Sequence, residues 1–144
     1  MKMPTRHNNE RGAAAVEFAL ILPFLLLLVF GGIEFGLLMF NKQVLTNASR
    51  EAARAGIVES GPDDAAIEGI ALSYCQDYLV TFDPDTSGAT VAISHPSGQD
   101  FPNPLTVTVS YSYRFLLLPD LRKLFGGEPS SGVTLVGTTT MRYE

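Results

Sequence analysis

The feature that most constrains this chain is an apolar run near its N-terminus, over residues 13–33. Glu17 is the only ionisable side chain in that run. At about 1.5 Å of rise per residue, a helix of this length spans the roughly 30 Å hydrocarbon core of a bilayer. The run therefore predicts one transmembrane helix. Glu17 is a candidate functional residue, because a charge inside a membrane costs on the order of a few kcal/mol.

A short basic segment, residues 1–12, precedes this run and carries Lys2, Arg6 and Arg11 against one acid, Glu10. A secretory signal peptide also opens with basic residues, but its apolar part covers about 7 to 15 residues and ends at a small-residue site such as Ala-x-Ala. Here the run is longer, and no such site follows before charged residues resume. The pattern favours a membrane anchor over an ordinary signal peptide.

The overall charge argues against one class of partner. The chain has 10 Lys and Arg against 15 Asp and Glu, for a formal net charge of −5. Its basic residues form no stripe that could follow a phosphate backbone, so nucleic-acid binding is not expected. Because Cys75 is the single cysteine, no intramolecular disulfide can form, while an intermolecular one stays open.

The helix is expected to continue beyond the membrane. Residues 41–58 keep a helix-forming composition, and small apolar residues recur at three- and four-residue spacing, at Val44, Ala48, Ala52 and Ala55. We predict one helix over residues 13–58, with its transmembrane part at about 13–40. Its second half would then act as a spine for the rest of the chain.

Three features within the span call for specific predictions. Pro23 removes one backbone donor and is expected to bend the helix. Gly32 and Gly36 have the Gly-x-x-x-Gly spacing that lets two helix backbones approach closely, although glycine is also common in membrane helices generally. Glu34 falls near the outer edge of the span, so its carboxylate is expected to reach headgroups or water.

Residues 59–144 predict a small α+β domain. The segment 59–62 breaks the first helix, and Asp63 and Asp64 suit the start of a second, amphipathic one. Its expected apolar stripe is Ile67, Ile70 or Ala71, Tyr74 and Tyr78, with Cys75 beside it as a small buried hydrophobe. Alternating patterns around 91–93, 105–115 and 133–143 then predict a three-stranded antiparallel sheet with one face covered by the helices.

Two stretches near the last loop carry weaker patterns. Residues 119–125 could add one or two turns of helix between the last two strands. Residues 115–118, with Leu121, Leu124 and Phe125, form a candidate apolar patch for a partner.

Candidate catalytic and metal-binding residues are few. His95 stands beside Pro96 and is expected to be a solvated loop histidine, and no nucleophile or phosphate-binding motif accompanies Cys75. Asp83, Asp85 and Ser87 resemble the opening of a calcium loop, but Ser94 stands where a bidentate Glu is needed. An acidic turn is the simpler interpretation. The sequence thus predicts no enzyme, no resident cofactor and no metal.

The segment Gly12-Ala13-Ala14-Ala15-Val16-Glu17-Phe18 resembles the processing site of prepilins of the tight-adherence (Flp, type IVb) class. The continuation over residues 33–56, IEFGLLMFNKQVLTNASREAARAG, resembles more specifically the TadE-like family of membrane-anchored pseudopilins or minor pilins. The resemblance is strongest over residues 11–56 and extends further only in pattern.

That resemblance implies cleavage after Gly12 by a prepilin peptidase, which would remove a leader of residues 1–12. It also implies a bacterial inner-membrane protein with a cytoplasmic N-terminus and a periplasmic C-terminal domain, possessing a processing and assembly motif at Glu17 and Phe18. The implied partners are other pilins, the peptidase, the inner-membrane assembly platform and membrane lipid. Two alternatives stay open: a membrane-anchored periplasmic enzyme using Cys75 and His95, and an anchored binding domain that is never cleaved.

Overall fold

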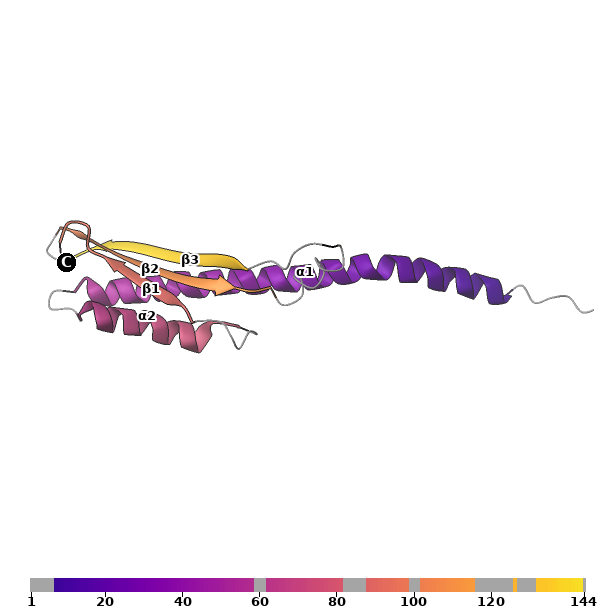
Figure 1. The fold of residues 1–144 in the computed structure, drawn as a ribbon, viewed down its shortest axis with the longest axis horizontal. Coiled ribbons are helices and arrows are strands. Elements are labelled where there is room, and N and C mark those ends of the chain that lie inside the picture. Colours follow the sequence, from indigo (N-terminus) through magenta and orange to yellow (C-terminus); the bar gives the residue numbers. More distant parts are fainter. Residues whose placement is uncertain are drawn as a thin grey trace, which may run out of the picture.

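The computed structural model describes residues 7–58, 62–81, 88–98, 102–115, 126 and 132–143, with side chains described from Gly12 onward. Two helices, α1 (His7–Gly56) and α2 (Asp64–Tyr78), are followed by three strands, β1 (Thr90–Ser94), β2 (Pro104–Tyr113) and β3 (Val133–Arg142). The α+β class and the order of elements confirm the prediction. In Figure 1 one half of α1 lies within the domain, while the indigo half extends well beyond it.

Helix α1 has 50 residues, which corresponds to about 75 Å. It begins at His7, six residues before the expected start, and continues through Pro23. Gly12 lowers helix stability by only about 1 kcal/mol relative to alanine, so it does not stop the helix from extending into the basic segment. The helix ends at Gly56, two residues before the predicted end.

Helix α2 starts where Asp63 caps it. The Asp63 side chain accepts a 3.0 Å hydrogen bond from the backbone N–H of Ala66, which satisfies one of the free donors of the first turn. The buried residues of α2 are spaced four apart, at Ile67, Ala71 and Cys75.

The predicted stripe of α2 was therefore wrong at its end. Tyr78 is 53% exposed, and the centroid of its ring lies 4.7 Å from that of Tyr74, which is partly buried against the core. Cys75, expected beside the stripe, is instead part of it and is buried, as predicted for a small hydrophobe. Small residues at 71 and 75 let α2 pack closely on α1, and Tyr78 lies outside this contact.

The sheet has the order β1-β2-β3 and is antiparallel throughout. Val107 on the central strand is paired with Ile93 on β1 and Thr139 on β3. The alternation predicted for β2 is confirmed, since its buried residues are Leu105, Val107, Val109, Tyr111 and Tyr113. These side chains join α1 and α2 in one core.

β3 crosses α1 with almost no space between the two backbones. A Cβ atom added at Gly137 would lie 2.5 Å from the carbonyl carbon and oxygen of Leu45. Only glycine fits there, because the nearest atoms are backbone and cannot move aside cheaply. This close approach places the sheet directly on the second half of α1.

Several sequence predictions fall outside the described residues. Asp83, Asp85 and Ser87 of the candidate calcium loop do so, as do the possible helical turn at 119–125 and all of the apolar patch except Phe115. Within the described ranges, no group of three His, Cys, Asp or Glu side chains is placed to hold a metal ion. The division into leader, spine and domain stays a prediction.

Candidate functional site

The first half of α1 presents bulky apolar side chains on its whole circumference. Phe24 and Leu28 are each 73% exposed, and the segment over residues 12–33 is exposed at nearly every position. By length and composition, α1 is the one helix of the described chain able to cross a membrane. A single-pass anchor explains this exposure, because lipid tails would cover the side chains that the domain leaves bare.

The residues of the predicted processing motif all lie on this exposed part. Gly12, Ala13, Glu17 and Phe18 are exposed positions of α1. Ala13 and Glu17 are four residues apart and therefore lie on one face of the helix. The bond between Gly12 and Ala13 is inside α1, a point that the sequence did not predict.

Gly32 and Gly36 lie at the end of the exposed half of α1 that is nearer the domain. A Cβ atom added at either one would meet nothing within 4 Å. Together they leave a smooth strip on the helix surface, one turn long. The strip is open to a neighbouring helix, and its role in packing stays a prediction.

Glu34 contradicts the prediction that its carboxylate reaches headgroups or water. Its side chain is only 2% exposed, and its Oε1 accepts a 3.1 Å hydrogen bond from the hydroxyl of Tyr113 on β2. Burial, followed by the charge of Glu34 and this hydrogen bond, raises the pKa of Tyr113 to about 12. The domain therefore begins to cover α1 at Glu34, which the sequence alone could not show.

Two further buried polar residues tie α1 to the domain. The Asn41 side chain donates to the Val80 carbonyl at 2.8 Å and accepts from the Val80 N–H at 3.0 Å. The Ser49 hydroxyl lies 2.7 Å from that of Thr139 on β3. We call these three contacts, Glu34 to Tyr113, Asn41 to Val80 and Ser49 to Thr139, the helix–domain junction.

The junction was not predicted from the sequence, although one signal was present. Glu34, Asn41 and Ala48 recur every seven residues, and all three are buried. Seven residues are close to two helical turns, so these positions share a face. Polar residues at the same helical spacing as the alanines of the expected packing face would have suggested that their partners lie on the domain.

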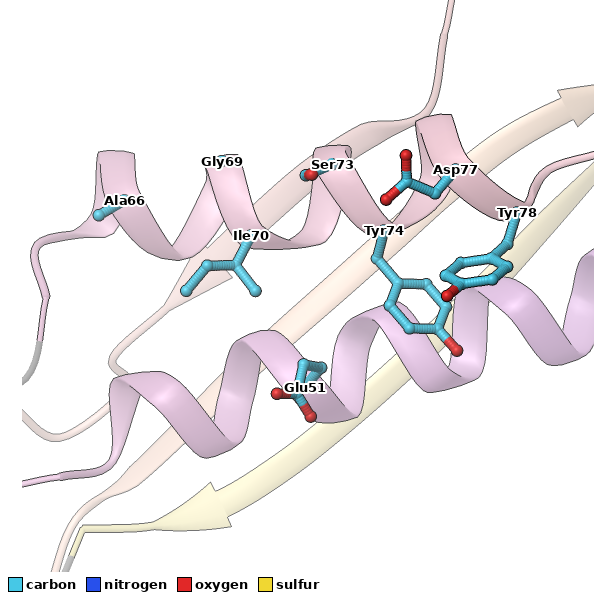
Figure 2. Close-up of a pocket in the computed structure, with 8 residues that line it drawn as sticks. All are labelled: Glu51, Ala66, Gly69, Ile70, Ser73, Tyr74, Asp77 and Tyr78. Atoms are coloured by element: carbon cyan, nitrogen blue, oxygen red, sulfur yellow. The ribbon is translucent and has the colours of Figure 1, made fainter.

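An open groove of about 560 Å³ runs between α1 and α2. Figure 2 shows Tyr74 and Tyr78 reaching from α2 toward α1, where Glu51 lies. The groove also contains Asp77, so it carries two carboxylates beside two aromatic rings. A second, smaller hollow adjoins it and shares Glu51 and Tyr74.

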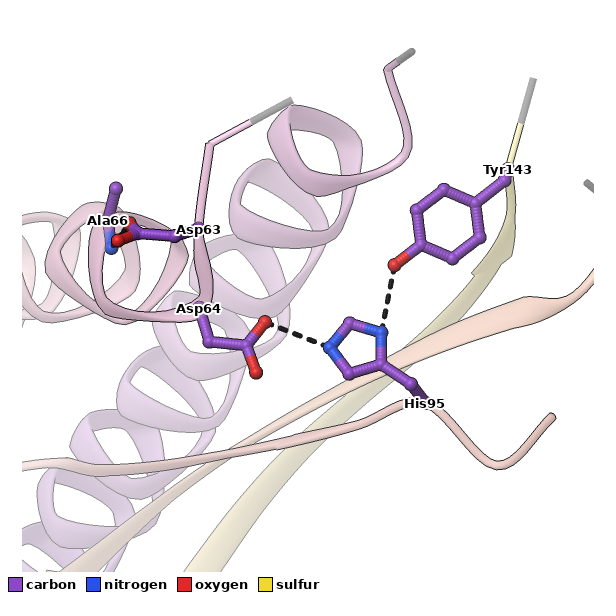
Figure 3. A network of polar contacts seen from close by, with 5 residues as sticks. All are labelled: Asp63, Asp64, Ala66, His95 and Tyr143. Atoms are coloured by element: carbon purple, nitrogen blue, oxygen red, sulfur yellow. Dashed lines mark hydrogen bonds and ion pairs between the residues drawn. The ribbon is translucent and has the colours of Figure 1, made fainter. Parts of the chain in front are cut away.

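His95 contradicts the prediction of a solvated loop histidine. Its side chain is 15% exposed. Its Nε2 lies 2.8 Å from Asp64 Oδ1 and its Nδ1 lies 2.8 Å from the Tyr143 hydroxyl (Figure 3). The reason is topological. β1 and β3 both end beside the start of β2, and the contacts of His95 join this end of the sheet to the first turn of α2.

The pairing of Cys75 with His95 that an enzyme would need is not formed. Both ring nitrogens of His95 are engaged by Asp64 and Tyr143. Cys75 is 3% exposed, and its burial raises the pKa of the thiol, which makes it a poorer nucleophile. The described residues thus offer no support for thiol chemistry.

Comparison with known proteins adds one finding. No curated protein and no solved structure matches the chain. A family model described as TadE-like protein matches residues 12–54, which are nearly the whole of α1. TadE-like proteins are pilus components, and the match indicates involvement in assembly of the Tad pilus and interaction with other pilins. The match thus relates the segment with the exposed anchor and the α1 side of the helix–domain junction to the TadE-like family model, and it does not extend to α2 or the sheet.

Proposed function

We propose that this chain is a pseudopilin or minor pilin of a tight-adherence (Flp, type IVb) pilus, held in the bacterial inner membrane until it assembles. The observation that carries the proposal is the exposed apolar half of α1 within the TadE-like match. An unpartnered helix of this kind needs lipid before assembly and other pilin helices afterwards. The small domain would then lie on the periplasmic side.

The membrane segment is best placed at residues 13–33. These residues cover roughly 30 Å as a helix, and burial against the domain starts at Glu34. The predicted segment of about 13–40 would instead draw the helix–domain junction toward lipid. Exposed Phe35, Met39 and Phe40 suit the interface above the hydrocarbon core or contacts with other pilins.

Cleavage after Gly12 would remove three basic residues and one acid, changing the formal net charge from −5 to −7. The target bond lies within α1, so the prepilin peptidase would have to unwind the first turns of the helix. Terminal turns fray readily, and glycine weakens a helix at its own position. Gly12 would also let the peptidase approach the backbone closely.

Cleavage would create an ammonium group on Ala13, one helical turn from Glu17. In a packed fibre that ammonium and the Glu17 carboxylate, on the same or a neighbouring subunit, would neutralise each other where neither charge is well solvated. Pairing at one depth would set the axial position of each subunit as it inserts. Glu17 would thus serve assembly rather than cleavage, with Phe18 next to it in the same motif.

The test is intact-mass analysis of the chain from membranes with and without the matching prepilin peptidase. Loss of residues 1–12 only when the peptidase is present is the expected result. An unchanged mass in both would contradict the proposal and favour an uncleaved anchor for a binding domain.

A variant separates the two roles of the motif. Glu17→Gln is expected to be cleaved normally but to reduce pilus assembly by about tenfold or more, because the new ammonium loses its partner. Thr46→Ala, on the domain half of α1, is the control with no expected effect on assembly. Normal assembly by Glu17→Gln would refute the charge-pairing mechanism.

A further inference from the structure

The groove between α1 and α2 belongs to a face of the domain that the anchor does not use. Its acidic side consists of Glu51 and Asp77. The adjoining hollow is lined by Arg50 and Arg54 together with Glu51. Tyr74 and Glu51 line both hollows.

The four charged side chains are exposed, and none of them forms an ion pair with another described residue. The ion pair formed within the described ranges joins His95 to Asp64 instead. The face therefore presents a positive side and a negative side next to each other. Arg50 and Arg54 are four residues apart, so they form one stripe on α1 beside Glu51.

Arg50, Glu51 and Arg54 lie within about one turn of α1 and so stand at a similar level above the anchor. Asp77 lies nearer the anchor, because the next residues of the chain reach Asn41. α1 and α2 lie side by side (Figure 1), and Tyr74 on α2 and Glu51 on α1 line the same groove. Two copies anchored in one membrane share the direction of α1 and the height of every residue. They can differ only by sliding in the membrane plane and rotating about the membrane normal.

A two-fold rotation about that normal makes the face complementary to itself. With the axis in front of Tyr74, the arginine side of one copy meets the carboxylate side of the other, and the reverse pair forms at the same time. An isologous contact of this kind needs only one patch. Anchoring also raises the effective concentration of the copies, so a modest contact suffices.

We propose that this face, defined by Arg50, Glu51, Arg54, Tyr74 and Asp77, binds a second copy of the chain in the membrane. The proposal rests on the proposed membrane anchoring and is independent of pilus assembly. Each interface forms two sets of pairs between Arg50 or Arg54 of one copy and Glu51 of the other, and Asp77 adds to the negative charge beside Glu51. The two Tyr74 rings lie at its centre, where aromatic residues contribute most to binding.

The test uses full-length chains with two different tags, expressed in membranes that lack the prepilin peptidase and other pilins. One variant, R50E with R54E, makes the face wholly acidic, and a second, E51R with D77R, makes it wholly basic. Capture of one tag measures how much of the other tag comes with it. Near-ultraviolet circular dichroism checks that each variant keeps its folded domain.

We expect wild-type copies to capture each other. Each variant paired with itself should show capture lower by about tenfold or more, because like charges then face each other. The acidic and basic variants expressed together should recover most of the wild-type capture. The control, E68R with R142E, reverses two exposed charges off the face and should capture as the wild type does.

Three results would overturn the proposal: no capture between wild-type copies, full capture between two copies of either variant, or no recovery when the variants are mixed. The last result would assign the face to a different partner. Pilus assembly plays no part in this readout. If copies fail to capture each other, the proposed function still stands. If the mass measurement shows an uncleaved chain, the proposed dimer still stands.

Discussion

The two halves of α1 are both rich in apolar residues, yet they differ in the size of those residues and in what covers them. In the first half, Phe24 and Leu28 are among many bulky side chains left exposed. In the second half, Ala48, Ala52 and Ala53 are fully buried beneath the sheet and α2. Small side chains are needed where other backbones come close, whereas bulky ones suit lipid or the helices of other pilins. The size of the apolar residues, more than their number, separates the two environments.

The sharpest test of this comparison replaces one leucine in each half. Leu45 is fully buried, so Leu45→Ala should lower the free energy of unfolding of the domain by about 2–5 kcal/mol. Leu28→Ala should change it by less than about 0.5 kcal/mol, because Leu28 touches little of the domain. Urea unfolding in detergent, followed by near-ultraviolet circular dichroism, measures both. Equal losses would show that the first half also packs on the domain.

A glycine substitution tests the close approach of β3. Gly137→Ala should lower the free energy of unfolding by about 1–3 kcal/mol, because the added Cβ would overlap the Leu45 carbonyl. Gly69→Ala on α2 is the control. A Cβ there meets nothing within 4 Å, and alanine should stabilise the helix by about 0.5–1 kcal/mol. A harmless Gly137→Ala would contradict the packing of β3 on α1.

The helix–domain junction can be tested at Asn41. Asn41→Ala should cost about 1–2 kcal/mol, since it leaves the N–H and carbonyl of Val80 without their partner. Asn47→Ala is the matched control. The Asn47 side chain accepts a hydrogen bond from the Gln43 side chain on the same helix, and among the described residues no hydrogen bond joins it to the sheet or α2. Hydrogen exchange at Val80 should also become faster in Asn41→Ala alone. Unchanged exchange would mean that Asn41 does not hold this segment.

The last test concerns pH at the contact between Glu34 and Tyr113, the part of the junction nearest the anchor. The pKa of Tyr113 is raised to about 12 in the folded chain, against about 10 in an unfolded one. The protonated hydroxyl therefore stabilises the fold fully below about pH 10, and this contribution is lost as the pH rises toward 12. The stability difference between the wild type and Tyr113→Phe should fall by at most about 1.4 kcal/mol per pH unit in that window. A constant difference would contradict the burial of the Tyr113 hydroxyl beside Glu34.

Much of the fold could be predicted because its signals are local. The alternation of β2 and the start of the second helix at Asp63 and Asp64 depend on neighbours in sequence; the alternation was confirmed, and α2 starts at Asp64 with Asp63 as its N-cap. Glu34 and His95 were predicted wrongly for the opposite reason. Their partners, Tyr113 and the pair Asp64 and Tyr143, lie between 31 and 79 residues away along the chain. The seven-residue spacing of Glu34 and Asn41 indicates a shared face of α1, but no periodic pattern identifies partners so far away in the chain.

The sequence by itself determined the long apolar helix, the order of helices and strands, and the resemblance to the TadE-like family, because each depends on composition, spacing or a contiguous motif. Only the tertiary structure decided where the domain starts to cover α1, which polar residues of that helix are buried, and which charges share the face around Tyr74. These outcomes depend on how β2, β3 and α2 pack against the helix. Packing brings together atoms that the sequence keeps far apart.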